Sequence, residues 1–244
     1  QKSPEALRSA VDKAETAAEN PKKAGKPDTW MKIGKAYVEA YNGPMGQLWI
    51  GASQAELQLV TGNAQPLSVE TVDLGGTPCQ KQVFADKDLY FNQNGQLVLI
   101  NVTKPVYEDA LAKALEAYAK AGELDVAGKK TKPIVAALDD IAAKYLNDGM
   151  NAYTLGELKE ASSDFENAAR AASTAPSNRL DTTAVYNAGF TSWAYANQLA
   201  ATDSLAAVAE YQRAKGFFES CLAAKYYYCL LYTSPSPRDR QKSR

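Results

Sequence analysis

Apolar residues recur with a helical period over most of this chain. In the segment 147–172, the small residues Gly149, Ala161 and Ala168 and the aromatic Phe165 stand at spacings that place them on facing sides of two helices. Small residues let helix backbones approach each other, and one ring fills the space that remains between them. The pattern therefore predicts an antiparallel helical hairpin.

Similar patterns predict further helices on both sides of this hairpin. The first starts at Ser3-Pro4, with Ser3 as its cap, and a second follows the predicted cap Asp28. The expected helices are one from 4 to about 20, then 29–41, 45–59, 107–124, 131–154, 157–172, one from 182 or 183, and one that carries Ala214, Phe218 and Cys221.

Between the two groups of helices the period changes to two residues, which is typical of strands. The expected strands are 68–74, 80–84, 89–93 and 96–102. Asn94-Gly95 between the last two predicts a type I′ hairpin, because both central residues must accept a positive φ. The run Leu97–Ile100 is apolar on both faces, so we expect this strand to be covered on both sides.

Four sets of positions resemble the motifs of a known repeat. Trp30, Ile33, Gly34 and Tyr37 stand at the spacing W-x-x-L-G-x-x-Y. The matching second helix, A-x-x-x-F-x-x-A, is found at three places: Ala114, Tyr118 and Ala121; Ala161, Phe165 and Ala168; Ala214, Phe218 and Cys221. These motifs resemble the tetratricopeptide (TPR) repeat, a helix–turn–helix unit that stacks into a solenoid.

The resemblance implies three repeats of unequal form. The repeat with Gly149 is uninterrupted, whereas 80 residues separate Gly34 from Ala114 and 25 separate Gly189 from Ala214. The implied fold class is mainly α, a TPR-like α-α superhelix of helical hairpin repeats with a small antiparallel β insertion. Two unrelated helices that flank a β domain are the alternative for the first repeat. The expected parts are 1–45 (N-terminal helix and first TPR helix), 46–105 (insertion), 106–228 (repeats) and 229–244 (tail).

Composition narrows the possible functions. The chain has no histidine, which excludes Ser-His-Asp and Cys-His nucleophiles and zinc sites that need imidazole. Its three cysteines form no CxxC pair, and 27 basic residues balance 28 acidic ones without a long basic stripe. We therefore expect no enzyme activity, no cofactor, no metal and no nucleic-acid partner, and the absence of a long apolar run predicts no membrane span.

The resemblance implies a concave groove lined by the first helix of each repeat. By position, the groove residues are Leu146, Met150, Tyr153, Tyr186, Phe190 and Trp193. The residues implied in packing within repeats are Trp30, Gly34, Tyr37, Ala114, Tyr118, Ala121, Gly149, Ala161, Phe165, Ala168, Gly189, Ala214 and Phe218. Alternatively, the groove residues only pack between the stacked repeats and bind no partner.

The expected function is that of a protein-interaction scaffold or adaptor of the bacterial cell envelope, which binds a peptide or helix of its partner in the groove. The alternative is a glycan- or small-ligand-binding module that uses the β insertion, with Trp49, Tyr90 and Phe91 as stacking residues.

Both ends of the chain carry signals of their own. A start at Gln1 fits a protein exported to the periplasm or cell surface after removal of a signal peptide, and a trimmed sequence is the other explanation. The segment Cys229–Asp239, CLLYTSPSPRD, resembles a translated sequencing-library adapter, so we expect 229–244 to be foreign to the natural protein.

Overall fold

The part of the chain that the structure describes, residues 2–62 and 64–225 of a computed structural model, is mainly helical with one small antiparallel sheet. It divides into two units, Gln1–Ile141 with Thr174–Asn178, and Ala142–Ser173 with the chain from Arg179 onward. Helix α6 (Thr131–Leu155) continues from the first unit into the second. The predicted adapter segment lies outside the described residues.

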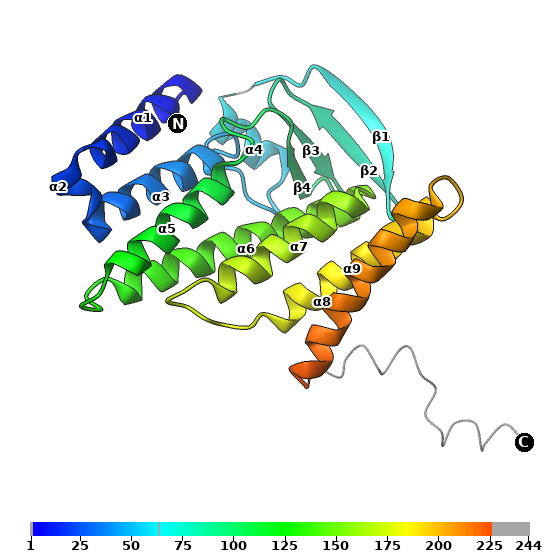
Figure 1. Cartoon of the computed structure of the whole chain (residues 1–244). Helices are drawn as coiled ribbons and strands as arrows, with labels where there is room; N and C mark the ends of the chain where they lie inside the picture. The colour runs from blue at the N-terminus through cyan, green and yellow to red at the C-terminus, as the bar shows by residue number, and fades with distance from the viewer. Residues whose placement is uncertain (1, 63, 226–244) are drawn as a thin grey trace, which may run out of the picture. The chain divides into compact units, whose positions relative to one another are not determined.

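Three helices of the first unit lie side by side (Figure 1): α1 (Pro4–Glu19), α3 (Pro27–Asn42) and α5 (Ala110–Leu124). The predicted Ser3 cap is present, since its hydroxyl accepts from the Ala6 N–H. The predicted cap at Asp28 is wrong. The cap is Lys26, because the helix starts at Pro27, two residues earlier than predicted, and Asp28 pairs instead with Lys130 at 2.7 Å.

Helices α3 and α5 pack on each other although the β insertion separates them in sequence. A Cβ added to Gly34 would lie 2.5 Å from the ring of Tyr118, so the glycine is what allows this close approach. On its other side, α3 packs on α1, and the buried Tyr37 donates its hydroxyl to Glu15 at 2.5 Å. The helices on either side of the insertion thus form one hairpin within a three-helix layer.

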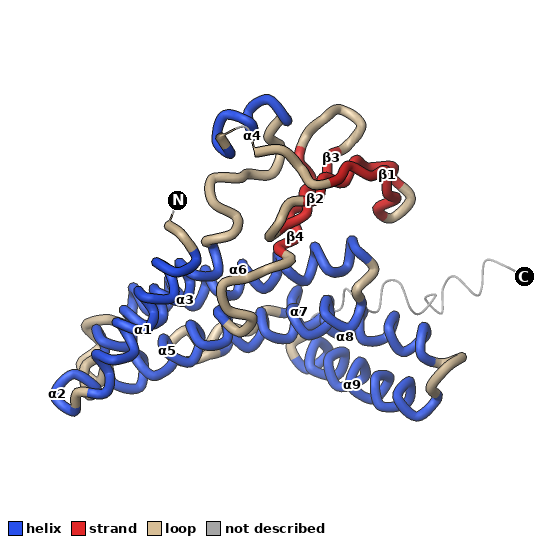
Figure 2. The backbone as a smooth tube through the Cα atoms, turned by 90° about the horizontal axis from the view of Figure 1, so that it is seen from above, coloured by secondary structure: helices blue, strands red, loops and turns tan. Residues whose placement is uncertain are grey.

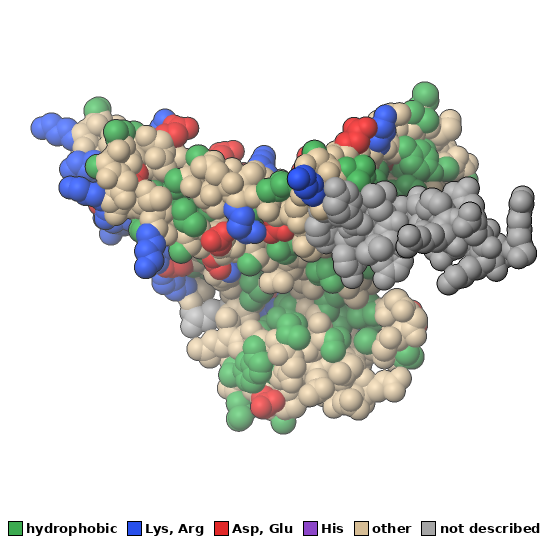
Figure 3. Space-filling model, turned by 90° about the horizontal axis from the view of Figure 1, so that it is seen from below, with side chains coloured by type: hydrophobic (Ala, Val, Ile, Leu, Met, Phe, Trp, Pro, Cys, Tyr) green, Lys and Arg blue, Asp and Glu red, His purple; other side chains and the backbone are tan. Residues whose placement is uncertain are grey.

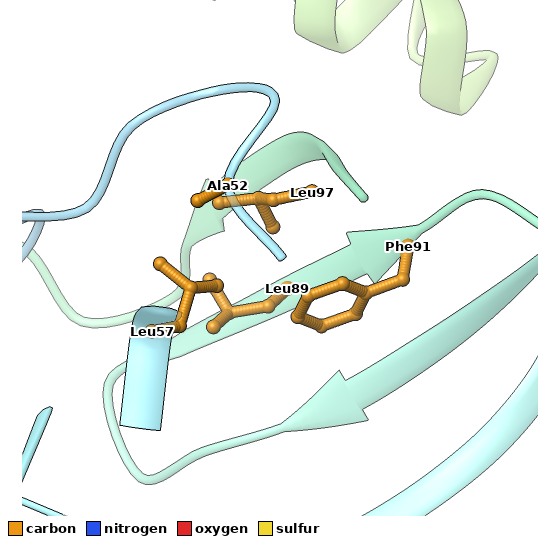
Figure 4. Close-up of a cluster of buried hydrophobic side chains, with 5 residues drawn as sticks. All are labelled: Ala52, Leu57, Leu89, Phe91 and Leu97. Carbon is orange, nitrogen blue, oxygen red and sulfur yellow. The ribbon is translucent and has the colours of Figure 1, made fainter. Parts of the chain in front are cut away.

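The sheet has the order β1-β2-β3-β4, with strands Ser68–Leu74, Thr77–Val83, Lys87–Phe91 and Leu97–Val102. Figure 2 shows these strands in red together with the short helix α4 (Gln54–Thr61) of the same unit. Their shared core consists of Ala52, Leu57, Leu89, Phe91 and Leu97 (Figure 4).

Two sequence predictions in this region are wrong. The segment 45–59 is helical only from Gln54, where Ser53 and Glu56 form a capping box that starts α4. Asn94-Gly95 is not a type I′ turn, because only Gly95 has a positive φ (73°). The Asn92 side chain accepts from the N–H groups of Asn94 and Gln96 and so begins the turn two residues earlier, in a longer loop that ends in a left-handed glycine.

The prediction that the run Leu97–Ile100 is covered on both sides holds for most of the run. Leu97 and Leu99 are buried, and Ile100 packs on the sheet core. Val98 is the exception at 38% exposure, because the pairing of β3 with β4 slips at this point and leaves Val98 without a register partner.

The second unit consists of the end of α6 with α7 (Leu158–Ser173), α8 (Thr182–Leu199) and α9 (Ser204–Ala223). A Cβ on Gly149 would lie 2.9 Å from the ring of Phe165, and a Cβ on Gly189 would lie 3.0 Å from the ring of Phe218. The length of α8 and α9 accounts for the wide spacing between Gly189 and Ala214.

A contrast between two helical glycines tests the close contact. Gly149→Ala pushes a methyl group into the Phe165 ring, and we expect a loss of about 1–3 kcal/mol in the free energy of unfolding. Gly216→Ala is the control, because nothing lies within 4 Å of its added Cβ. There we expect a gain of up to about 1 kcal/mol from helix propensity. Equal urea midpoints for the two variants would contradict the role assigned to Gly149.

Candidate functional site: an aromatic face on α6 and α8

The second unit exposes a face of large side chains that no described segment covers. It is formed by Met150 and Tyr153 of α6 and Phe190 and Trp193 of α8, which we call the aromatic face. Met150, Tyr153 and Trp193 are 51%, 42% and 46% exposed, and Phe190 is half-buried. Such a cluster is uncommon on a surface without a partner.

The two helices contribute to this face for identifiable reasons. Asp181 caps α8 by accepting from the Ala184 N–H at 3.0 Å. On the buried side of α8, the hydroxyl of Ser192 donates to the Glu210 carbonyl at 3.1 Å, and Ser162 of α7 donates to the Ala188 carbonyl at 3.0 Å. These contacts fix the rotation of α8 about its axis. The opposite side, with Phe190 and Trp193 three residues apart, is therefore held toward solvent.

Ring contacts join the two helices into one face. The rings of Tyr153 and Phe190 have centroids 6.1 Å apart, and those of Phe190 and Trp193 lie 6.0 Å apart. These distances are within the range of favourable aromatic pairs. Since side chains with few rotatable bonds hold each other in place, little conformational freedom remains to be lost when a partner binds.

One of the two helices that form the aromatic face carries no charged side chain. Helix α8 has no Asp, Glu, Lys or Arg from Thr182 to Leu199, although 23% of the chain is charged. On the α8 side of this face a ligand therefore meets apolar and uncharged polar groups, and nothing on α8 selects for an acidic or basic partner.

Four of the six groove residues predicted from the sequence lie on the aromatic face. The other two do not. Leu146 packs on the core cluster of Ala152, Ala161, Phe165 and Ala188. Tyr186 turns toward α9, where its ring lies 6.0 Å from that of Phe218. The repeat-packing residues are mostly buried, and Trp30 donates its indole N–H to the Ala24 carbonyl at 2.8 Å.

The stacking residues proposed for a glycan on the β insertion are wrong in two of three cases. Tyr90 and Phe91 are only 4% and 1% exposed, because consecutive residues of β3 are covered on both faces of the sheet. Trp49 is exposed but lies in the loop before α4. The sequence alone does not show whether aromatic side chains in a strand are exposed to a ligand. The packing on both faces of the sheet shows that Tyr90 and Phe91 are buried.

Other chemistry is sparse within the described residues. They contain no cluster of acidic, cysteine or histidine side chains that could hold a metal ion, and none of their helices has the length and hydropathy that crossing a bilayer requires. Cys79 and Cys221 are both buried, and neither forms a disulfide within the part of the chain that the structure describes. Neither shows the exposure expected of a reactive cysteine.

One titratable group of the second unit stands out. Burial, with help from the negative charges of Asp148 and Glu160, raises the pKa of Asp164 to about 7. Burial also raises the pKa of the neighbouring Tyr145 to about 12. A carboxyl group with a raised pKa makes the stability of the fold depend on pH.

The comparisons with known proteins give no family. No protein-family model matches this chain, and no curated protein or solved structure shows a significant match. The functional argument therefore depends on the geometry above.

The raised pKa of Asp164 predicts a pH-dependent stability. The ordinary pKa is 3.8, so between about pH 4 and 7 the native state holds a proton that the unfolded chain releases. The free energy of unfolding contributed by Asp164 thus falls as the pH rises through this window. We expect Asp164→Asn to be more stable than the parent at pH 8, by roughly 1–2 kcal/mol after allowance for partial exposure, and the difference to vanish near pH 4. The prediction would be contradicted if the difference in free energy of unfolding between Asp164→Asn and the parent, measured with urea, were the same at every pH from 4 to 8.

Proposed function

We propose that this chain is a TPR-like protein-interaction module that binds an uncharged, apolar segment of a partner protein on the aromatic face. The observation that carries the proposal is the aromatic face, in which the exposed Met150, Tyr153 and Trp193 adjoin the half-buried Phe190. Tyr and Trp side chains provide much of the binding energy at protein interfaces, because they bury a large area and lose little entropy. The absence of charged residues on α8 supports an apolar segment as the ligand.

The repeated glycine–ring contact supports the TPR-like part of the proposal. In three helix pairs a glycine of the first helix meets an aromatic ring of the second: Gly34 with Tyr118, Gly149 with Phe165, and Gly189 with Phe218. The same contact at equivalent positions is what a repeat architecture requires. In such an architecture the first helices of neighbouring repeats, here α6 and α8, present their outer residues together.

A peptide-display selection against the purified chain tests the proposal. We expect it to enrich segments with two or more large apolar residues and few charges. Trp193→Ala and Tyr153→Ala should each weaken the selected peptide by about tenfold or more, as for central interface aromatics. Leu205→Ala is the matched control, since Leu205 is an exposed apolar residue of the same unit on α9.

Two results would count against the aromatic face. One is a peptide whose affinity, measured by fluorescence titration, is unchanged in the double variant of Tyr153 and Trp193. The other is an equal loss in Leu205→Ala, which would indicate non-specific adsorption to apolar surface.

A further inference from the structure

A cleft lies over one face of the sheet in the first unit, and none of the residues of the aromatic face lines it. It consists of two adjoining hollows, of about 320 and 160 Å³, which share Gln54. The polar side chains that line it include Gln54, Gln58, Gln65, Gln80, Gln82 and Asn92. Most of its polar lining is thus primary amide.

Helix α4 and strand β2 form the two long sides of the cleft. The capping box at Ser53 starts α4, and the buried Leu57 anchors it on the sheet core. Gln54 and Gln58, one turn apart, then lie on the same face of the helix. Every second residue from Pro78 on β2 to Phe84 just after it lines one of the two hollows, so Gln80 and Gln82 face the cleft. Together the two hollows extend on the order of 20 Å along this segment.

The side chains that line the cleft are all uncharged. From Met45 to Val69 the only charged residue is Glu56. Its carboxylate accepts hydrogen bonds from the backbone N–H and the hydroxyl of Ser53 in the capping box. In Figure 3 the part of the molecule that holds the sheet and α4, at the bottom of the view, shows few charged side chains. A charged ligand would lose hydration here without gaining a counter-charge.

The amides of the cleft are held by one another. The side-chain N–H groups of Gln54 and Gln82 both donate to Oε1 of Gln80, at 2.7 and 3.2 Å. Among the described residues, this leaves the NH₂ group of Gln80 and the carbonyl oxygens of Gln54 and Gln82 to bond a ligand. Donors and acceptors thus stand next to each other in fixed positions, above a floor formed by Leu89 and Phe84.

We propose that this cleft binds a neutral oligosaccharide. Each sugar hydroxyl donates and accepts, and a primary amide offers an acceptor oxygen beside two donor hydrogens, so adjacent hydroxyls match an amide pair. The apolar floor suits the C–H face of a sugar ring, and the length of the cleft suits several linked rings. An extended peptide is the poorer ligand, because the cleft lies on the face of the sheet, whereas a peptide strand pairs with an edge such as β1.

Calorimetric titration with four neutral oligosaccharides, namely maltohexaose, cellohexaose, xylohexaose and chitohexaose, tests the proposal. We expect saturable binding of at least one of them by the full chain. Gln80→Ala removes the amide that joins the other two, and should weaken this binding by about tenfold. Gln47→Ala is the matched control, since Gln47 is an exposed glutamine of the same unit outside the cleft, and it should leave the affinity unchanged.

Because Gln80 is exposed, its replacement should not unfold the chain, and a thermal melt of each variant checks this. Trp193→Ala should leave sugar binding intact, which separates this site from the aromatic face. The proposal is overturned if none of the four sugars binds saturably at millimolar concentration. It is equally overturned if Gln80→Ala and Gln47→Ala have the same affinity, or if a neutral extended peptide binds more tightly than every sugar.

Discussion

The contact between a glycine and an aromatic ring is the constraint on which the helical part of this structure depends. An added Cβ would collide with the facing ring at Gly34 and Gly149 and would make a tight contact with the facing ring at Gly189. The helix axes can then approach closely, and flanking alanines such as Ala161 and Ala168 are fully buried. Within the second unit, the same contacts decide which side of α6 and α8 is turned inward. They therefore also decide that Tyr153, Phe190 and Trp193 are turned outward.

The sequence predicts the helical hairpins well, because their signal is local and periodic. The pairing of α3 with α5 across the insertion was also predictable, since the Gly34 and Tyr118 positions repeat a pattern that Gly149 and Phe165 show without interruption. The mainly helical class with a small antiparallel sheet is confirmed. The TPR superhelix and the export to a cell envelope stay predictions.

The sequence predictions fail where a side-chain hydrogen bond or the packing of the sheet overrides the local sequence pattern. Asn92 draws the hairpin turn toward itself by accepting two backbone N–H groups, and no propensity of Asn94-Gly95 reveals this. Tyr90 and Phe91 point to opposite faces of β3, and both faces are covered, which is a property of the packed sheet. In the amide-lined cleft, Gln54 contacts Gln80, which is 26 residues away in the sequence. This contact depends on the strand register, so the sequence alone does not predict that the glutamines form a site.

Helix α6 belongs to both units, and this has a consequence for how the chain unfolds. Its first eleven residues, Thr131–Ile141, pack in the first unit and the remainder in the second. An isolated helix of fewer than about 12–15 residues is marginal in water, so neither part of α6 is expected to persist once its own unit has melted. The loss of one unit thus removes the continuation of α6 from the part of the helix that remains in the other unit. Because the two units share this helix, their free energies of unfolding depend on each other. A mutation that destabilises one unit is therefore expected to destabilise the other as well.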